Sequence, residues 1–249
     1  MRPALWGESL KLAASLVGRV ATVAVVVGIV VLSSAMLVAA RSGNTQVVAK
    51  LGPDGTPDWH GFLAAATQIT AAGGLAGFAI VLAWMFGREF ADGAVNGLFA
   101  LPVSRRTIAA AKLLTFAAWG ALVSAALPVV LGATGVALGL GTPGATELAG
   151  LARLTVLGLA GLVLATPVAW AATLGRSVLA GVGVGIGLIV VAQVSVLAGA
   201  GGWMPLAAPA LWAMTAGRGA TLGQVLLVLP FGAIWVVLTL GAWRRLQVR

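Results

Sequence analysis

Residues 20–40 read VATVAVVVGIVVLSSAMLVAA, a run of 21 uncharged residues that lies between Arg19 and Arg41. As an α-helix with a rise of about 1.5 Å per residue, this run would extend roughly 32 Å, enough to cross the hydrocarbon core of a bilayer. Apolar blocks of the same kind recur along the chain. The stretch therefore predicts a membrane-spanning helix.

The composition of all 249 residues leads to the same conclusion. Apolar residues make up 60% of the chain and charged residues only 8%, whereas a soluble domain has about 45–50% and about 25%, respectively. Fifteen Lys or Arg and six Asp or Glu cannot form a water-facing shell on a chain of this length. The composition excludes a soluble globular protein and predicts a single all-α, polytopic membrane domain.

The charge-free blocks predict six spans and therefore place both termini on the same side of the membrane. We expect an amphipathic helix over residues 1–19 and a loop over 87–112 between the second and third spans. The fifth span is followed by an outer segment that contains Trp and Pro, over residues 199–220. The spans themselves cover about residues 20–40, 62–86, 113–140, 153–175, 178–198 and 222–243.

The distribution of basic residues predicts the orientation. Four of them (Arg41, Lys50, Arg153 and Arg218) fall on one side, and eleven fall on the side that carries the termini and residues 87–112. By the positive-inside rule, that second side is cytoplasmic. The charges anchor helix ends to an anionic leaflet and form no stripe of the kind that binds nucleic acid. The eleven are Arg2, Lys11, Arg19, Arg88, Arg105, Arg106, Lys112, Arg176, Arg244, Arg245 and Arg249.

The segment before the first span has two chemically different helical faces. This pattern predicts a helix that lies on the inner membrane surface. A cytoplasmic extension of the first span is the alternative. One face carries Glu8, Lys11, Ser15 and Arg19, and the other carries Trp6, Leu10, Ala13 and Val17.

Several kinds of chemistry are excluded by what the chain lacks. It has no cysteine and one histidine, His60, so thiolate sites and a histidine metal cluster within one chain are ruled out. None of the three lysines follows the glycine of a phosphate-binding loop. No ionisable residue lies near the middle of a span, where ion-coupled carriers usually place one. If the chain does work across the membrane, the energy must come from another polypeptide.

Two glutamines are the strongest candidates for a polar substrate path through the spans. Gln68 lies in the second span and Gln193 in the fifth. Hydrogen bonding between helices is the alternative explanation. Two interleaved G-x-x-x-G pairs predict close helix packing in the fifth span, and three prolines predict kinks in the third, fourth and sixth. These residues are Gly181, Gly183, Gly185 and Gly187, and Pro128, Pro167 and Pro230.

The loop of residues 87–112 reads GREFADGAVNGLFALPVSRRTIAAAK and carries six charges. Residues 89–99 can form a short helix, which Pro102 ends because the residue before a proline avoids helical geometry. Ser104 has the chemistry to cap the next helix, from Arg105 onward. With Leu98, Phe99, Leu101 and Val103 as apolar side chains, this elbow suits docking to a cytoplasmic partner. An ordinary amphipathic loop on lipid headgroups is the alternative.

The chain resembles the membrane subunits of type-two ABC exporters over nearly its whole length. Their loop after the second span has a Glu, a Gly four residues later and then Pro-x-Ser-Arg. Here Glu89, Gly93, Pro102, Ser104 and Arg105 match that pattern. Where the family commonly has Thr after the glycine, this chain has Ala94.

The resemblance implies that this loop holds a coupling helix that seats in a separate ATPase subunit. The residues assigned to ATPase coupling are Glu89, Gly93, Leu98, Phe99, Pro102, Ser104 and Arg105. Two ATPase copies would bind ATP and Mg, and two permeases, identical or similar, would pair in the plasma membrane of a bacterium. This chain would hold no cofactor or metal and would not itself be an enzyme. The outer segment, with Trp203, Met204, Leu206, Pro209 and Trp212, would re-enter the outer leaflet.

We therefore expect a permease that exports a hydrophobic or amphipathic substrate, such as a drug, a peptide antibiotic or a lipid. One alternative is the substrate-binding membrane component of an energy-coupled vitamin importer, which would need a polar pocket and no long coupling loop. A structural or enzyme-inhibiting membrane protein is a third reading. Charge reversal at Glu89 separates the first from the others.

Overall fold

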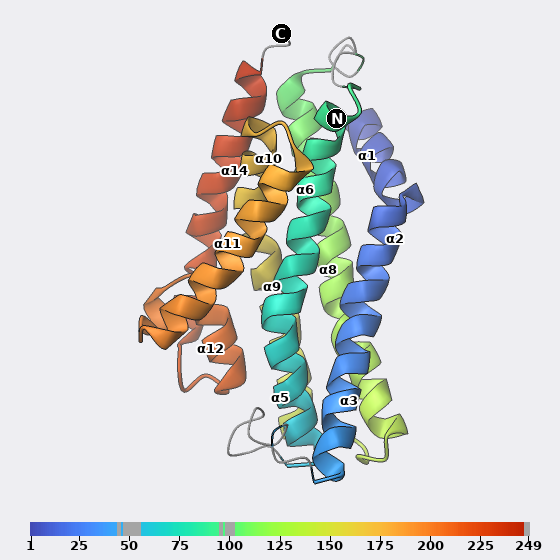
Figure 1. Cartoon of the computed structure of the whole chain (residues 1–249), viewed down its shortest axis with the longest axis vertical. Coiled ribbons are helices and arrows are strands. Elements are labelled where there is room, and N and C mark those ends of the chain that lie inside the picture. Colours follow the sequence, from blue (N-terminus) through green and yellow to red (C-terminus); the bar gives the residue numbers. More distant parts are fainter. Residues whose placement is uncertain (44–45, 47–55, 95–96, 98–102, 247–249) are drawn as a thin grey trace.

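The computed structural model describes residues 1–43, 46, 56–94, 97 and 103–246, and all regular structure in these residues is helical. Six helical segments of the described chain are long and apolar enough to cross a membrane, which confirms the predicted number. They form an elongated bundle with α1 and the end of α14 at the same end, here called the α1 end (Figure 1). An even number of spans requires the first helix and the end of the last helix to lie at the same end of the bundle, as they do here.

An interruption of the helical geometry at Ser15 precedes the first span. Helix α1 (Arg2–Ala14) ends before Ser15, whose extended backbone separates it from α2 (Leu16–Val23). The Ser15 hydroxyl donates to the Leu12 carbonyl and accepts from the Gly18 amide. One side chain thus satisfies groups at both helix ends, and the elbow falls before the boundary expected at residue 19. Helix α2 continues through the π-helix η1 (Ala24–Gly28) into α3 (Ile29–Arg41).

The second and third spans pack side by side. The second contains α5 (Trp59–Ile69), the π-helix η2 (Thr70–Gly74) and α6 (Leu75–Ala91). The third is the single helix α8 (Arg105–Ala137). Phe78 of α6 packs edge-on against Phe116 and Trp119 of α8, with ring centroids 6.2 and 5.8 Å apart. These aromatic contacts fix the two helices side by side.

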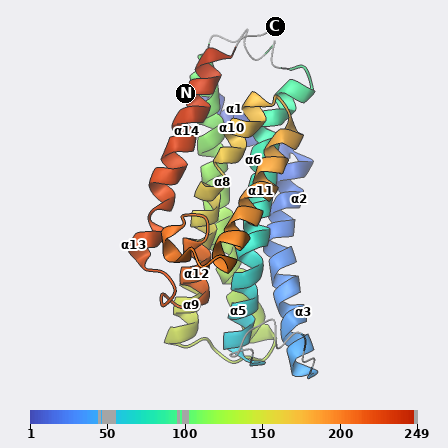
Figure 2. The same ribbon diagram turned by 60° about the vertical axis from the view of Figure 1, so that its left-hand side comes forward.

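The remaining spans complete the bundle (Figures 1 and 2). The fourth consists of α9 (Ala145–Leu164) and α10 (Pro167–Leu174), and the fifth is α11 (Val178–Leu197). The sixth consists of α13 (Leu222–Val225) and α14 (Val228–Arg245). The fourth and sixth spans are interrupted beside their prolines, as predicted: Pro167 and Pro230 lie in the first turns of α10 and α14. In the third span, Pro128 lies within the continuous α8. A proline is well tolerated in a first turn because its missing amide hydrogen would have no helical partner there.

One of the two predicted glycine pairs packs as expected. A Cβ placed on Gly181 or Gly185 would meet Ala83 or Ala79 of α6 at 2.7 or 2.6 Å, so these glycines let α11 approach α6 closely. Gly183 and Gly187 face open space instead. The close approach is therefore confirmed for one face of α11.

The segment after α11 forms two short helices. These are the 3₁₀ turn η3 (Gly201–Trp203) and α12 (Ala208–Met214). Figure 1 shows α12 beside the bundle, short of the end reached by α3 and α5. This position suits the expected re-entrant segment, which stays a prediction because the structure contains no membrane.

Candidate functional site

Four charged side chains from three helices meet at the α1 end of the bundle. Glu8 and Lys11 come from α1, Glu89 from the end of α6 and Lys112 from the second turn of α8. Lys112 Nζ lies 3.0 Å from Glu8 Oε2 and 2.8 Å from Glu89 Oε1. Lys11 Nζ lies 2.8 Å from Glu8 Oε1 and 3.1 Å from Glu89 Oε1. Each lysine therefore bridges both glutamates, and we call these four residues the charge cluster.

Because the charge cluster is buried, it fixes the position of α1. The side chain of Lys112 is only 1% exposed, those of Glu8 and Glu89 are 7% and 6% exposed, and that of Lys11 is 43% exposed. Removing a charge from water has a large desolvation penalty, which is offset here by opposite charges with hydrogen-bond geometry. A displaced α1 would leave buried charges without partners. The cluster therefore holds α1 in one position against α6 and α8.

The amphipathic pattern of residues 1–19 does not predict that Glu8 is buried. Glu8 is on the polar face, yet it points into the bundle, whereas the apolar Trp6 and Leu10 are 72% and 52% exposed. At a membrane surface the outward direction offers an apolar environment, so either face of such a helix can be turned outward. Partners inside the bundle decide the orientation here.

The pKa values of the two α1 residues reflect this environment. Burial alone would raise the pKa of Glu8, but the charge of Lys112 and hydrogen bonds from both lysines outweigh it and lower the pKa below its ordinary value. For Lys11, burial is likewise outweighed by the hydrogen bonds and charges of Glu8 and Glu89, which raise its pKa. Both residues are thus held in their charged forms.

Acidification provides a test of the Glu8 contribution. Because the pKa of Glu8 is lowered on folding, its stabilisation is present above the ordinary value of 4.5 and is lost as pH falls through the lowered value. We expect the difference in thermal stability between the native chain and Glu8→Gln, in detergent, to be constant near neutral pH and to shrink below about pH 4.5. A difference that persists unchanged to about pH 3 would contradict the ion pairing of Glu8.

The predicted coupling residues occupy several environments. Glu89 is buried in the charge cluster, and Gly93 follows the end of α6 with a φ of +66°, a left-handed conformation that favours glycine. The Ser104 hydroxyl caps α8 by accepting from the Thr107 amide at 3.1 Å, as the sequence predicts. Arg105 donates to the Leu246 carbonyl beyond the end of α14. Leu98, Phe99 and Pro102 lie outside the described residues. Of the helix expected over residues 89–99, residues 89–91 belong to the end of α6 and residues 92–94 form a turn.

The end of α14 contacts two further helices, α10 and α6, through Trp243. Trp243 is fully buried, and its indole Nε1 donates to the Thr173 hydroxyl of α10 at 2.9 Å. Its ring lies edge-on to Phe86 of α6, with centroids 5.7 Å apart. Together with the Arg105 contact, this joins the ends of the second, third, fourth and sixth spans around the loop of residues 87–112.

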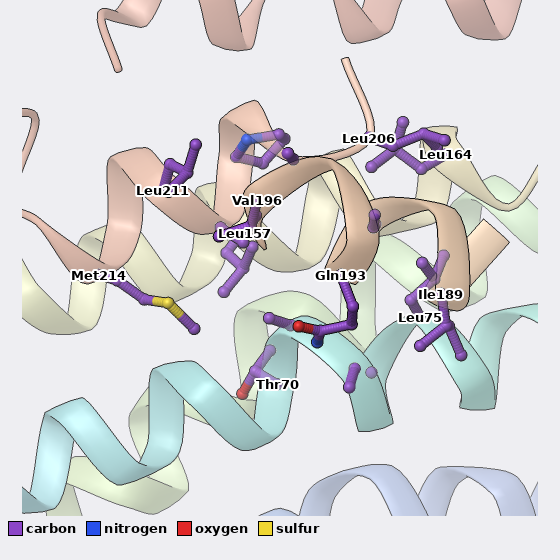
Figure 3. A pocket seen from close by; sticks show the side chains of 18 of the residues that line it. Thr70, Leu75, Leu157, Leu164, Ile189, Gln193, Val196, Leu206, Leu211 and Met214 are labelled. Atoms are coloured by element: carbon purple, nitrogen blue, oxygen red, sulfur yellow. The ribbon is translucent and has the colours of Figure 1, made fainter. Parts of the chain in front are cut away.

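A separate cavity lies between the second, fourth and fifth spans and α12 (Figure 3). Its volume is about 90 Å³, far below the roughly 300–1,000 Å³ of sites for drug-sized molecules. Gln193 and Thr70 contribute polar groups to a lining that is otherwise apolar. Gln68 does not line this cavity and lies exposed on α5. The two glutamines proposed for one path are therefore not brought together within this chain.

The sequence reasoning missed the partners of Glu89. The sequence places Glu8 on the polar face of a surface helix and Lys112 among the charges that anchor helix ends. In the structure these two residues, 104 positions apart, form a buried ion pair. A signal was available in the scarcity of acidic residues, since only Glu8, Glu89 and Asp92 lie near the eleven basic residues of that side. By contrast, nothing in the sequence TAAGG indicates that these residues form the π-helix η2 or that they line the cavity.

The chain was compared with known protein families, curated proteins and solved structures. A family model described as "ABC-2 family transporter protein" matches residues 5–192. The matched range runs from α1 into α11 and contains the whole charge cluster. Neither the curated proteins nor the solved structures gave a match.

Proposed function

The chain belongs to the ABC-2 family of transporter proteins, and on this premise we propose that it is the permease subunit of an ATP-driven exporter. A separate cytoplasmic ATPase, present in two copies, supplies the energy, and two permease chains pair to form the passage. The family match over three quarters of the chain carries this proposal. The six spans and the residues around the 87–112 loop support it.

The charge cluster explains how a push on the loop would reach the membrane. The loop joins α6 to α8, and both helices are tied to α1 through Glu89 and Lys112. A force on the loop would therefore move α1, α6 and the start of α8 together rather than bend one helix. Glu89 acts in this account as a positioning residue, while Leu98 and Phe99 make the contact with the ATPase.

The proposed substrate is hydrophobic or amphipathic. The described cavity offers mainly apolar walls and two polar side chains, Thr70 and Gln193, and no charged residue lines it. Its small volume favours a closed arrangement that must open, or a passage formed between two copies. Gln68, exposed on α5, is available to such a passage between copies.

Cross-linking at the proposed docking site tests this function. The chain has no cysteine, so single-cysteine variants give unambiguous attachment points. Ser104, within the loop of residues 87–112, is exposed and is replaced by cysteine. Thr146→Cys, exposed at the opposite end of the bundle, is the matched control. We expect a photoreactive probe at position 104, in membranes of the source cell, to capture a polypeptide with a phosphate-binding loop, and the purified product to hydrolyse MgATP.

The control decides the interpretation. Capture of the same polypeptide from position 146, or capture at 104 of proteins without a nucleotide site, would contradict the proposed coupling surface. Labelling of intact cells with a membrane-impermeant thiol reagent checks the orientation: position 146 should react and position 104 should not.

A further inference from the structure

A groove with two arginines lies between α10 and α14 near the α1 end of the bundle. Its volume is about 800 Å³, enough for a headgroup and the upper part of an acyl chain. Trp170 of α10, which lines the groove, packs against Trp235 of α14, with ring centroids 5.3 Å apart. The two helices that form the walls of the groove are therefore in direct contact with each other.

Both charged residues that line this groove in the described part of the chain are basic. Arg176, from the turn between α10 and α11, and Arg245, from the last turn of α14, both line it, and no acidic residue does so among the described ones. Two guanidinium groups from separate elements can each give paired hydrogen bonds to phosphate oxygens. Basic pockets between membrane helices on the cytoplasmic side are suited to anionic headgroups.

The backbone at Arg176 adds a second observation. Its φ is +46°, in the left-handed region that usually selects glycine after a helix end. An arginine in this position costs about 1 kcal/mol relative to glycine. The strain places the guanidinium at the groove, and such strain is typical of functional positions.

Apolar side chains border the same groove. Leu174, Val237 and Leu238 are 56%, 67% and 42% exposed and lie toward the membrane from the arginines. The arrangement of charge at the helix ends and apolar surface toward the bilayer matches a lipid with a negative headgroup. Leu246 also lines the groove and accepts the hydrogen bond from Arg105 at the start of α8.

We propose that the groove binds one anionic phospholipid, with its phosphate between Arg176 and Arg245 and an acyl chain along Leu174 and Val237. The site is independent of the transported substrate and of the ATPase. Because Leu246 is joined to Arg105, an occupied groove steadies the end of α14 against the helix that follows the 87–112 loop. Loss of the lipid would therefore loosen that contact.

Native mass spectrometry of the whole chain with phosphatidylglycerol or phosphatidylcholine tests the proposal. We expect the native chain to retain phosphatidylglycerol preferentially, and Arg176→Gln combined with Arg245→Gln to lower that preference about tenfold. Arg244→Gln is the matched control, because Arg244 is exposed on the same helix turn but does not line the groove. It should leave the preference unchanged.

A steric variant makes the test independent of charge. Gly241 lines the groove, and a Cβ there meets no atom within 4 Å, so the side chain of Gly241→Leu begins in open space and extends into the groove. We expect it to reduce phosphatidylglycerol retention although both arginines remain. Gly183→Leu, also open but on α11, should not.

Three results would overturn the proposal. The first is an equal loss in Arg244→Gln, which would indicate general surface attraction. The second is full retention in Gly241→Leu. The third is saturation of the site by soluble glycerol phosphate with the same affinity as the lipid, which would indicate a free anion as the ligand.

Discussion

Replacing Lys112 by methionine is expected to lower the free energy of unfolding by about 3–5 kcal/mol, the largest single effect among the charge-cluster residues. Methionine matches the length of the side chain but leaves two buried carboxylates, Glu8 and Glu89, to share Lys11, their one remaining basic partner among the described residues. The loss comes mainly from this uncompensated buried negative charge rather than from the missing contacts. Unfolding of the purified chain in detergent by heat or by SDS titration measures it.

Lys11→Met is the matched control, since Lys11 contacts the same two glutamates but is 43% exposed. We expect it to lower the stability by about 1 kcal/mol or less, because water can replace part of its contribution. Combining Lys112→Met with Glu89→Gln should be less harmful than the sum of the two single changes, because one buried charge is removed with its partner. Equal losses in Lys112→Met and Lys11→Met would contradict the burial of the cluster.

Gly87→Ala is expected to have the second largest effect, a loss of about 1–3 kcal/mol despite the better helix propensity of alanine. A Cβ at Gly87 would lie 2.5 Å from the Val178 amide nitrogen and 2.7 Å from its Cα. These are backbone atoms at the start of α11, so they cannot move away as a flexible side chain could. Thermal unfolding in detergent, with retention on a sizing column as a check of folding, measures the change.

The matched control for Gly87→Ala is Gly183→Ala. A Cβ at Gly183 meets no neighbouring atom within 4 Å, so alanine should be neutral or stabilising by up to about 1 kcal/mol. If Gly87→Ala were as harmless as this control, α11 would not pack against the end of α6 as described.

The sequence was sufficient for the features that depend on local chemistry or on the membrane. Charge-free length predicts the number of spans, and the Ser104 hydroxyl predicts the start of α8. Both follow from one segment and its solvent. The glycine spacing predicts close packing of the fifth span, but that Gly181 and Gly185 make it, and that α6 is the partner, comes from the structure. The family resemblance, carried by the loop pattern, agrees with the family match.

The charge cluster could not be derived in the same way because its members come from three helices. An amphipathic α1 has two faces, and near a membrane surface the pattern does not say which one contacts protein. Only the positions of Glu89 and Lys112 turn Glu8 inward. The groove between α10 and α14 likewise depends on a turn and a helix end some 70 residues apart, Arg176 and Arg245.

We propose that this chain provides a passage through the membrane and that a separate ATPase drives transport through it. Reconstitution into sealed vesicles, with MgATP and a fluorescent hydrophobic compound, tests it most directly. We expect the chain alone to produce no uphill movement, and the chain with the ATPase captured at position 104 to produce movement that stops when MgATP is removed. Sustained uphill transport by the purified chain alone would contradict the account.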